Sequence, residues 1–102
     1  MPPYLYDGQV TRKDLADYMH EVSRTDYYTG QLRKELKKQG IEKDTYIIYM
    51  ADNGRPLPRC KTRLYDSGIR TPFLIARPGN IKPAVTDSLI SSIDISATIL
   101  EL

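Results

Sequence analysis

The sequence is poor in the residues that mark several classes of protein. Its 102 residues include one cysteine, one phenylalanine and no tryptophan. A single cysteine cannot form a disulfide within the chain, which excludes a disulfide-stapled scaffold. The apolar runs are only a few residues long, so we expect no membrane-spanning helix. The 15 basic and 13 acidic side chains nearly balance, and a net charge of +2 is too small to indicate nucleic-acid binding by itself.

Length and composition leave room for one small domain at most. Eight of the nine aromatic residues are tyrosines, which carry a polar hydroxyl into any core they enter. Hydrophobic residues, tyrosine included, make up 40% of the chain, and when tyrosine is left out and glycine is counted the apolar share is below the about 45–50% usual for a soluble domain. We therefore expect a core that is thin for a self-sufficient domain.

A long amphipathic helix is predicted at residues 11–39, after an extended lead-in at residues 1–10. Thr11 and Asp14 have the T-x-x-D spacing of a capping box, and Gly40 suits the left-handed position just after a helix. Apolar residues recur every three or four positions, which indicates one buried face. That face is formed by Leu15, Tyr18, Val22, Thr25, Thr29, Leu32 and Leu36.

Two residues interrupt the pattern of this helix. Gly30 lies in its middle, where glycine costs about 1 kcal/mol relative to alanine, and Asp26 lies beside the apolar face. We interpret Gly30 as a point of close approach for a neighbouring element, one loop of which bonds Asp26.

The rest of the chain is predicted to alternate strands and loops. Residues 45–50 form an unbroken β-branched and aromatic run, typical of a strand covered on both faces, as in a parallel sheet. After it we expect a polar loop at 51–68 and, within 72–102, a strand (72–76), a turn (77–80), a short third strand (85–90) and the start of a last helix. Two strands with open edges are marginal alone. The sequence therefore predicts an α/β fold, as a piece of a larger, mainly parallel sheet flanked by helices.

The first candidate site follows the strand at 45–50. Asp52, Asn53 and Gly54 come directly after it, and open α/β sheets place ligands beyond the carboxyl ends of their strands. A carboxylate and an amide oxygen side by side are suitable ligands for Ca²⁺ or Mg²⁺. The same residue types also favour a plain turn. The residues alone leave a divalent-cation site and a simple turn both open.

A group of basic residues occupies the loop that follows. It consists of Arg55, Arg59, Lys61, Arg63 and Arg70. Such a group binds anions such as sulfate or phosphate, with arginine as a bidentate fork and lysine as a point charge. A solvated charged loop or a weak nucleic-acid patch has the same composition, and on the residues alone the solvated loop is the simpler interpretation.

The remaining candidates for catalytic residues are Cys60, the only histidine and two aspartates. A charged Lys61 beside Cys60 favours a reactive thiolate, but His20 lies far away on the predicted helix, where a surface position is the simpler interpretation. Asp66 and Asp94 have the residue type of catalytic carboxylates, and each also fits a local turn or a helix cap. For Asp94 we favour the cap.

Three stretches of the sequence together resemble the sulfatases, a family of the alkaline-phosphatase-like superfamily. They are IIYMADNG, CKTRLYDSGIRTPFLIARPG and SLISSIDISATILEL, in that order after the long helix. The resemblance begins near Leu15 and implies that residues 1–102 are the C-terminal part of a sulfatase catalytic domain with an alkaline-phosphatase-like fold. The P-x-P after DNG and the K-x-x-L-Y segment are most similar to the heparan N-sulfatase (sulfamidase) branch.

The resemblance implies roles for five residues. Asp52 and Asn53 match the pair that binds the active-site divalent cation, usually Ca²⁺, so half of a metal site is expected here. Lys61 matches the lysine of G-K-G-T-x-Y-E-G-G, which contacts the sulfate and offsets its developing charge, as a catalytic and substrate-binding residue. Arg70 and Pro72 match G-I-R-x-P, for which we expect a structural role.

The sequence also departs from the family pattern. Cys60 replaces the glycine before the lysine, and Thr62 replaces the glycine after it. The family's nucleophile is a formylglycine made from the cysteine or serine of C/S-x-P-x-R, and no residue here matches that motif. We therefore expect the nucleophile to lie outside this chain, and the 102-residue chain alone to be inactive.

The expected parent protein is a hydrolase of sulfate esters or N-sulfate groups, acting on a sulfated small molecule or glycan. Neither nucleic acid nor membrane is an expected partner, and open sheet edges favour self-association. A periplasmic, secreted or lysosome-like location is typical of the family. The alternatives are a phosphatase or phosphonate hydrolase of the same superfamily, a non-catalytic interaction module and, last, a nucleic-acid binder whose affinity falls steeply with salt.

Overall fold

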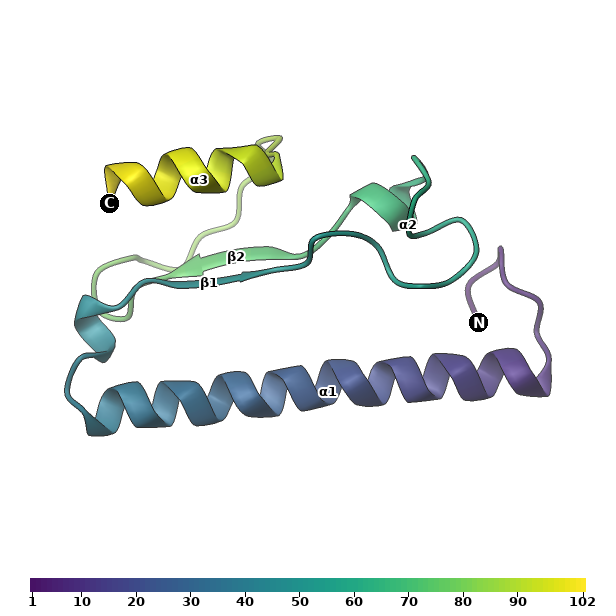
Figure 1. Cartoon of the computed structure of the whole chain (residues 1–102), viewed down its shortest axis with the longest axis horizontal. Coiled ribbons are helices and arrows are strands. Elements are labelled where there is room, and N and C mark those ends of the chain that lie inside the picture. Colours follow the sequence, from purple (N-terminus) through teal and green to yellow (C-terminus); the bar gives the residue numbers. More distant parts are fainter.

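A computed structural model describes all of residues 1–102. Its elements in chain order are helix α1 (Gln9–Lys38), a 3-10 turn η1 (Glu42–Asp44), strand β1 (Ile47–Met50), the short helix α2 (Asp66–Ile69), strand β2 (Phe73–Ala76) and helix α3 (Ser92–Glu101). The two strands lie between α1 on one side and α3 on the other, and the lead-in and α2 share one end of the molecule (Figure 1). None of the helices combines the length and hydropathy needed to cross a membrane.

Helix α1 is present as the sequence predicts, with a corrected start. It begins at Gln9, two residues before the expected boundary, and its N-cap is Gly8 rather than Thr11. The Asp7 carboxylate accepts two hydrogen bonds from the Arg12 guanidinium, at 2.6 and 2.9 Å, across this first turn. An acid that precedes the helix complements the positive end of the helix dipole, so the chain enters the helix before Thr11 is reached.

The end of α1 follows the prediction at Gly40. Gly40 has a φ of +76°, and its N–H donates to the Lys37 carbonyl at 3.1 Å while the Ile41 N–H donates to the Leu36 carbonyl at 3.1 Å. This pair of bonds is the Schellman arrangement, which requires a left-handed residue just after the helix. Glycine meets that requirement without steric cost.

Strands β1 and β2 pair antiparallel, so a parallel sheet is not confirmed. The register joins Ile47 to Ala76 and Met50 to Phe73, and the Ala51 N–H continues the ladder to the Pro72 carbonyl at 3.2 Å. A parallel pair needs a crossover connection from one end of the sheet to the other. The loop between these two strands instead returns at the same end of the strands, so that the chain runs back alongside β1 and the pairing is antiparallel.

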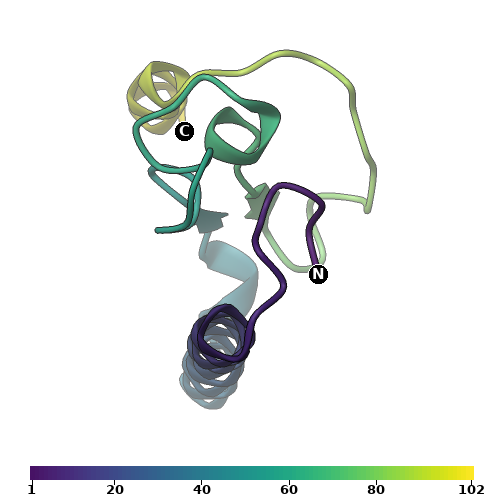
Figure 2. The same cartoon turned by 90° about the vertical axis from the view of Figure 1, so that its right-hand side faces the viewer.

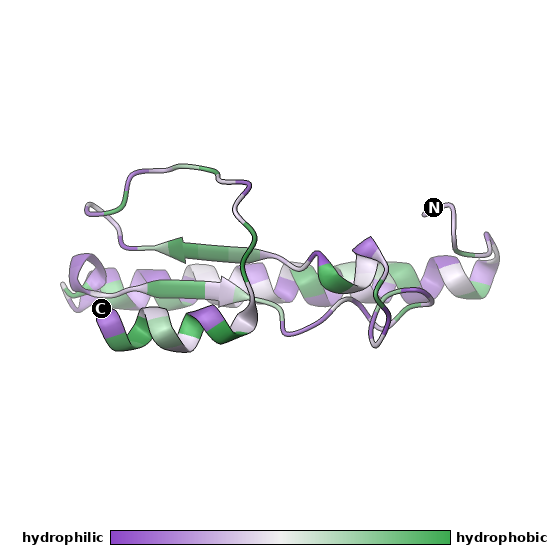
Figure 3. Cartoon of the chain, turned by 90° about the horizontal axis from the view of Figure 1, so that it is seen from above, coloured by the Kyte–Doolittle hydropathy of each residue, from purple (hydrophilic) through white to green (hydrophobic).

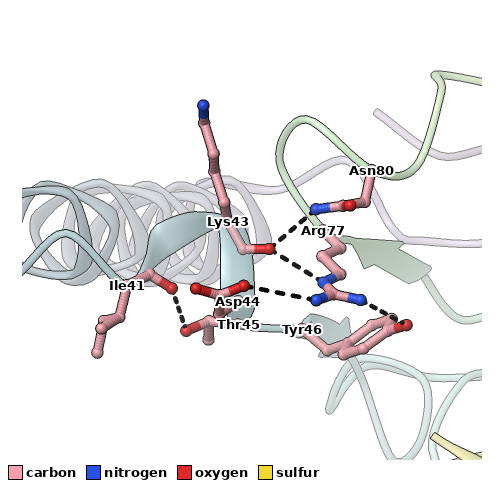
Figure 4. Close-up of polar contacts among 7 residues, drawn as sticks. All are labelled: Ile41, Lys43, Asp44, Thr45, Tyr46, Arg77 and Asn80. Carbon is pink, nitrogen blue, oxygen red and sulfur yellow. Dashed lines mark hydrogen bonds and ion pairs between the residues drawn. The ribbon is translucent and has the colours of Figure 1, made fainter.

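The opposite end of the strand pair is fastened by polar contacts (Figure 4). The Lys43 carbonyl accepts hydrogen bonds from Arg77 Nε at 3.0 Å and from Asn80 Nδ2 at 2.9 Å. The Arg77 guanidinium also lies 5.0 Å from the centre of the Tyr46 ring and 3.6 Å from the Asp44 carboxylate. These contacts hold the segment before β1 against the turn after β2.

The helices stand apart from the strands. No Cα atom of α1 or α3 lies within 8 Å of a Cα atom of either strand, and a cavity of about 760 Å³ separates α1 from the strand pair. Apart from the adjoining backbone of α1 itself, no atom lies within 4 Å of a Cβ placed on Gly30, so no neighbouring element occupies that position in this structure. Asp26 lines the cavity, and no hydrogen bond to a loop is formed there. Figure 2 shows the separation end-on.

The chain has almost no core of its own. Only three residues are buried, among them Leu5 and Cys60, and the third is Gly54. The radius of gyration is 16.7 Å, against about 13 Å for a compact chain of this length. Strand β2 is hydrophobic along its whole length and β1 over its first half, and α3 carries hydrophobic positions along its length (Figure 3). This bears out the expected thin core.

The last part of the chain differs from the prediction at one strand. Residues 85–90 form no strand, because no other strand lies beside them to complete a ladder, and every residue from 81 to 90 is exposed. Helix α3 then begins where the sequence indicates. The Ser91 N–H donates to the Asp94 carboxylate at 2.7 Å, which confirms Asp94 as a helix-capping residue.

Candidate functional site

The candidate site is the long loop between β1 and β2, and two glycines close it. The Gly54 N–H donates to the Gly68 carbonyl at 3.1 Å. A Cβ added to Gly54 would lie 2.7 Å from the Gly68 Cα, and a Cβ added to Gly68 would collide with the carbonyl oxygens of Cys60 and Arg63. Only glycine allows this approach. The D-N-G and G-I-R-x-P segments, distant in sequence, therefore meet backbone to backbone.

Asp52 and Asn53 follow β1 directly and present oxygen atoms that the chain does not use. The Asp52 side chain is exposed and forms neither an ion pair nor a hydrogen bond. Asn53 is half-buried and donates from Nδ2 to the Gly54 carbonyl at 2.8 Å, so its Oδ1 remains as a free acceptor. These two hard oxygen donors fit a share of a Ca²⁺ or Mg²⁺ site. No group of three or more His, Cys, Asp or Glu side chains gathers anywhere in the chain.

Lys61 lies in the most constrained part of this loop. Its side chain is exposed and forms no ion pair, while its N–H donates to the Arg55 carbonyl at 3.1 Å. The residues on either side of the Cys60–Lys61 pair have left-handed backbones, with φ of +60° at Arg59 and +66° at Thr62. At Thr62 the sulfatase pattern has glycine, the residue that this conformation suits best. Threonine is thus held in a backbone conformation typical of glycine.

Cys60 lies at the centre of the loop with its side chain completely buried. Its Sγ donates to the Pro58 carbonyl at 3.4 Å and lies 3.6 Å from the Tyr4 hydroxyl. The Arg55 guanidinium donates to the same Tyr4 hydroxyl and lies 5.9 Å from the centre of the Tyr4 ring. The lead-in, 56 residues away in sequence, therefore covers the cysteine.

The surroundings of Cys60 shift the pKa of its thiol. Burial alone raises the pKa of the Cys60 thiol, but hydrogen bonds from Ser67, Tyr4 and Arg55, together with the Arg55 charge, bring its pKa below the ordinary value. The same contacts, with the Cys60 hydrogen bond first, raise the pKa of Arg55. Arg55 Nε is buried without a hydrogen-bond partner. His20 is exposed on α1 and bonds none of these residues, so no cysteine–histidine pair is formed.

A cleft of about 610 Å³ opens beside the loop, between α1 and the carboxyl end of β1. Its lining includes Asn53, Asp66 and three residues of the basic group, Arg55, Arg59 and Arg70. Asp52, Lys61 and Arg63 are not among the residues that line it. The structure thus brings part of the predicted site into one cleft and leaves Asp52 and Lys61 exposed outside it.

Aromatic partners of the basic group were not evident in the sequence. The Arg59 guanidinium lies 5.5 Å from the centre of the Tyr65 ring, and the Arg55 guanidinium lies 5.9 Å from the centre of the Tyr4 ring. Two of the five basic residues therefore form cation–π contacts within the chain. Tyr65 follows Arg59 closely, and an arginine and tyrosine in one loop is a usable signal. Tyr4 gives no local signal, because its partners are brought to it only by the fold.

Comparison with known proteins assigns the family. The family model described as Sulfatase matches residues 3–102. An ulvan-active sulfatase from Formosa agariphila is 32% identical over 100% of this chain and 17% of its own length. Human N-sulphoglucosamine sulphohydrolase is 33% identical over 99% of this chain and 20% of its own. Human arylsulfatase A is 35% identical over 95% of this chain and 22% of its own length.

These matches cover the segment that contains the strand pair, the Gly54–Gly68 loop and both flanking helices. The chain belongs to the sulfatase family. Membership implies an alkaline-phosphatase-like α/β fold for the domain as a whole, of which the helices and strands described above are a part. The chain spans about a fifth of the length of these relatives. No solved structure matches it.

Proposed function

We propose that this chain is part of the catalytic domain of a sulfatase that hydrolyses sulfate esters or N-sulfate groups, releasing sulfate and an alcohol or amine. The supporting observation is that the loop between β1 and β2 carries free oxygen donors directly after β1 and an unpaired lysine on a constrained backbone. The family match supplies the reaction class. A central, mainly parallel sheet, to which the strand pair adds an antiparallel edge, belongs to the same proposal.

Asp52 and Asn53 are the proposed ligands of a divalent cation, Ca²⁺ by family resemblance. The Asp52 carboxylate is exposed and unpaired, and the Asn53 Nδ2 bond to Gly54 turns the amide so that Oδ1 is free. Ca²⁺ takes six to eight oxygen ligands, so the remaining ligands come from outside this chain. When bound, the cation would withdraw charge from the sulfate oxygens.

Lys61 is the residue proposed to contact the sulfate group. A sulfate ester gains negative charge on its leaving oxygen and sulfate oxygens as the bond to sulfur breaks. A fixed ammonium group close to those oxygens stabilises this charge more than it stabilises the substrate. Lys61 has no ion-pair partner to neutralise it, and its backbone is held at a hydrogen-bonded position. We assign it the role of sulfate-contacting residue.

The helices and strands of this chain carry apolar faces that nothing in the chain covers. Exposed apolar side chains on two different elements, β2 and α3, include Leu74 at 63%, Ile93 at 79% and Leu100 at 87%. Soluble proteins rarely leave such contiguous surfaces in water. We infer that further parts of a sulfatase domain pack on α1, the strands and α3. When the 102-residue chain is isolated, we expect these faces and the open strand edges to cause self-association.

We assign the nucleophile, a formylglycine by family resemblance, to a part of the protein outside this sequence. We therefore expect the 102-residue chain alone to release no sulfate. The substrate of the intact protein is a sulfated small molecule or glycan. The same layout of strand, D-N-G and basic loop suits a phosphatase of the superfamily, so the two ester types must be compared directly.

The test measures p-nitrophenyl sulfate and p-nitrophenyl phosphate hydrolysis by the intact protein and its Lys61→Ala variant. Loss of one oxyanion-stabilising contact costs about 10²- to 10³-fold in kcat, and we expect a loss of that size on the sulfate ester. Lys82→Ala is the matched control, because Lys82 is an exposed lysine in the irregular segment 81–90. We expect its kcat to equal that of the wild type.

Two outcomes would overturn the proposal. Faster turnover of the phosphate ester than of the sulfate ester would assign the protein to the phosphatase branch. Equal kcat values for Lys61→Ala and Lys82→Ala would remove Lys61 from the site. The metal assignment is tested separately by the calcium content of dialysed protein, which we expect Asp52→Ala to lower at least tenfold, the usual minimum for loss of a group that supports a metal.

A further inference from the structure

Three side chains hold the Lys61 loop from the inside. They are Tyr4, Arg55 and Cys60, called here the Cys60 cluster. The Cys60 Sγ is completely buried between the Pro58 carbonyl at 3.4 Å and the Tyr4 hydroxyl at 3.6 Å. Arg55 donates to that hydroxyl from the other side. None of the three is needed to bind sulfate or metal in the function proposed above.

The backbone around the cluster is in a conformation that needs support. Arg59 and Thr62 both have left-handed φ angles although neither is glycine. Such residues persist only where the surrounding structure holds them, and they concentrate at functional sites. The support is visible on both sides of Lys61, because the Cys60 N–H bonds the Leu57 carbonyl and the Arg63 N–H bonds the Cys60 carbonyl, each at 3.1 Å.

The cluster and Lys61 share one residue as their anchor. Arg55 bonds Tyr4 through its guanidinium, and its carbonyl accepts the Lys61 N–H at 3.1 Å. The Lys61 side chain itself is exposed and unpaired, so nothing beyond its backbone fixes where its ammonium group lies. A displacement of Arg55 or Cys60 therefore moves Lys61 directly.

We propose that Tyr4, Arg55 and Cys60 are positioning residues. They fix the strained loop backbone on which Lys61 meets the sulfate group. The inference rests on the proposed function for what Lys61 does, but not for how the loop is held. It links the lead-in at Tyr4 to the loop across 56 residues of sequence. It also accounts for a cysteine at a position where the family pattern has glycine, because the thiol fills the interior of the loop.

The test uses three variants of the intact protein and one control. Tyr4→Phe removes the hydroxyl shared by Cys60 and Arg55, Cys60→Ala removes Sγ, and Cys60→Ser keeps a hydrogen-bonding group there. Tyr6→Phe is the control, because Tyr6 lies in the same lead-in but is 83% exposed. Amide hydrogen exchange of segment 57–63 reports how the loop is held, without reference to activity.

We expect exchange in segment 57–63 to be about tenfold faster in Tyr4→Phe and Cys60→Ala, with Cys60→Ser intermediate and Tyr6→Phe equal to the wild type. In the sulfatase assay, a misplaced Lys61 should lower kcat about tenfold while KM changes less than about twofold. A merely structural role would accelerate exchange and leave kcat unchanged.

Each outcome decides one part of the inference. Unchanged exchange in Tyr4→Phe and Cys60→Ala would overturn the cluster as a support of the loop. Accelerated exchange with wild-type kcat would overturn its positioning role. If the wild-type protein hydrolysed no sulfate ester, the proposed function would fail, and the exchange data alone would still decide whether the cluster holds the Lys61 backbone.

Discussion

The loop that joins β1 to β2 is built in the opposite way to helices α1 and α3. All three buried residues of the chain, Leu5, Gly54 and Cys60, lie in this loop or in the lead-in that covers it. Helices α1 and α3 contain no buried residue at all. The loop is the irregular part and the helices are the regular part, yet the irregular part is the one that makes its own interior.

The difference shows where each region obtains its stability. Helix α1 is maintained by its own backbone bonds and by exposed pairs such as Lys13–Asp17 at 2.6 Å, which contribute little in water. Most stability of a protein helix comes from packing its apolar face, and that packing is missing here. The loop instead has close backbone contact, a buried thiol and two arginine–tyrosine pairs. A candidate site with its own support can keep its geometry while its surroundings vary.

The largest expected effect comes from removing a side chain that the proposed cover would bury. Leu74 on β2 is 63% exposed in this chain and lines the cavity facing α1, whereas Leu64 in the loop is 92% exposed. In the intact protein we expect Leu74→Ala to lower the free energy of unfolding by about 3 kcal/mol. Leu64→Ala should change it by less than about 0.5 kcal/mol. Urea unfolding of both variants measures the contrast.

Equal, small losses for the two leucine variants would mean that the strand face stays open in the intact protein. The difference between the regions would then be a permanent feature, and the inference that a larger domain packs on α1 and the strands would be wrong.

The next largest effects on the free energy of unfolding are expected at two glycines. A Cβ on Gly68 collides with carbonyl oxygens of the loop, while a Cβ on Gly30 of α1 meets nothing within 4 Å. In the 102-residue chain we expect Gly68→Ala to lower the free energy of unfolding by about 2 kcal/mol, as overpacking does. Gly30→Ala should raise it by up to about 1 kcal/mol, the helix preference for alanine. Thermal unfolding followed by circular dichroism distinguishes the two signs.

The Gly30→Ala variant is also informative in the intact protein. If it lowers the free energy of unfolding there instead of raising it, a neighbouring element packs against Gly30, which is the close approach that the sequence suggests. If Gly68→Ala were as stable as the wild type in the 102-residue chain, the closed neck of the loop would not form in solution.

Local patterns in the sequence were sufficient for the regular elements. The three- and four-residue spacing predicted α1, Gly40 predicted its end, and Asp94 predicted the start of α3. Each of these signals acts within a few residues of where it stands. The start of α1 was predicted wrongly, because two local signals compete there and Gly8, with Asp7 pairing to Arg12, precedes Thr11.

Contacts between distant residues could not be predicted. The antiparallel pairing depends on how the loop returns, which the composition of a strand does not specify. The expected strand at 85–90 had suitable residues but no partner. In the site, Asp52, Asn53 and Lys61 came from a short motif, and their roles stay predictions. The cover over Cys60 joins residues 56 positions apart, and no pattern in the sequence connects Tyr4 with the loop.

The smallest expected effect is a pH dependence confined to the loop. Hydrogen bonds and the Arg55 charge outweigh burial and lower the pKa of Cys60 in the folded protein, so the folded state releases its proton at a lower pH than the unfolded state. The unfolded state then binds more protons just below the ordinary thiol pKa of about 8.5, and stability rises with pH in that window. Above it the gain is complete, and as pH falls through the folded pKa it is lost.

Urea unfolding of the intact, reduced protein between about pH 7 and pH 10 measures this dependence. Cys60→Ser is the matched variant, because a serine hydroxyl occupies the same place and does not titrate in this range. We expect the free energy of unfolding to rise toward pH 9 more steeply in the wild type than in Cys60→Ser. A wild-type free energy of unfolding that falls with pH relative to Cys60→Ser would mean that burial prevails and Cys60 stays a thiol, and parallel profiles would mean that the opposing influences cancel. The loop would then be held by packing alone, as the helices are expected to be once they are covered.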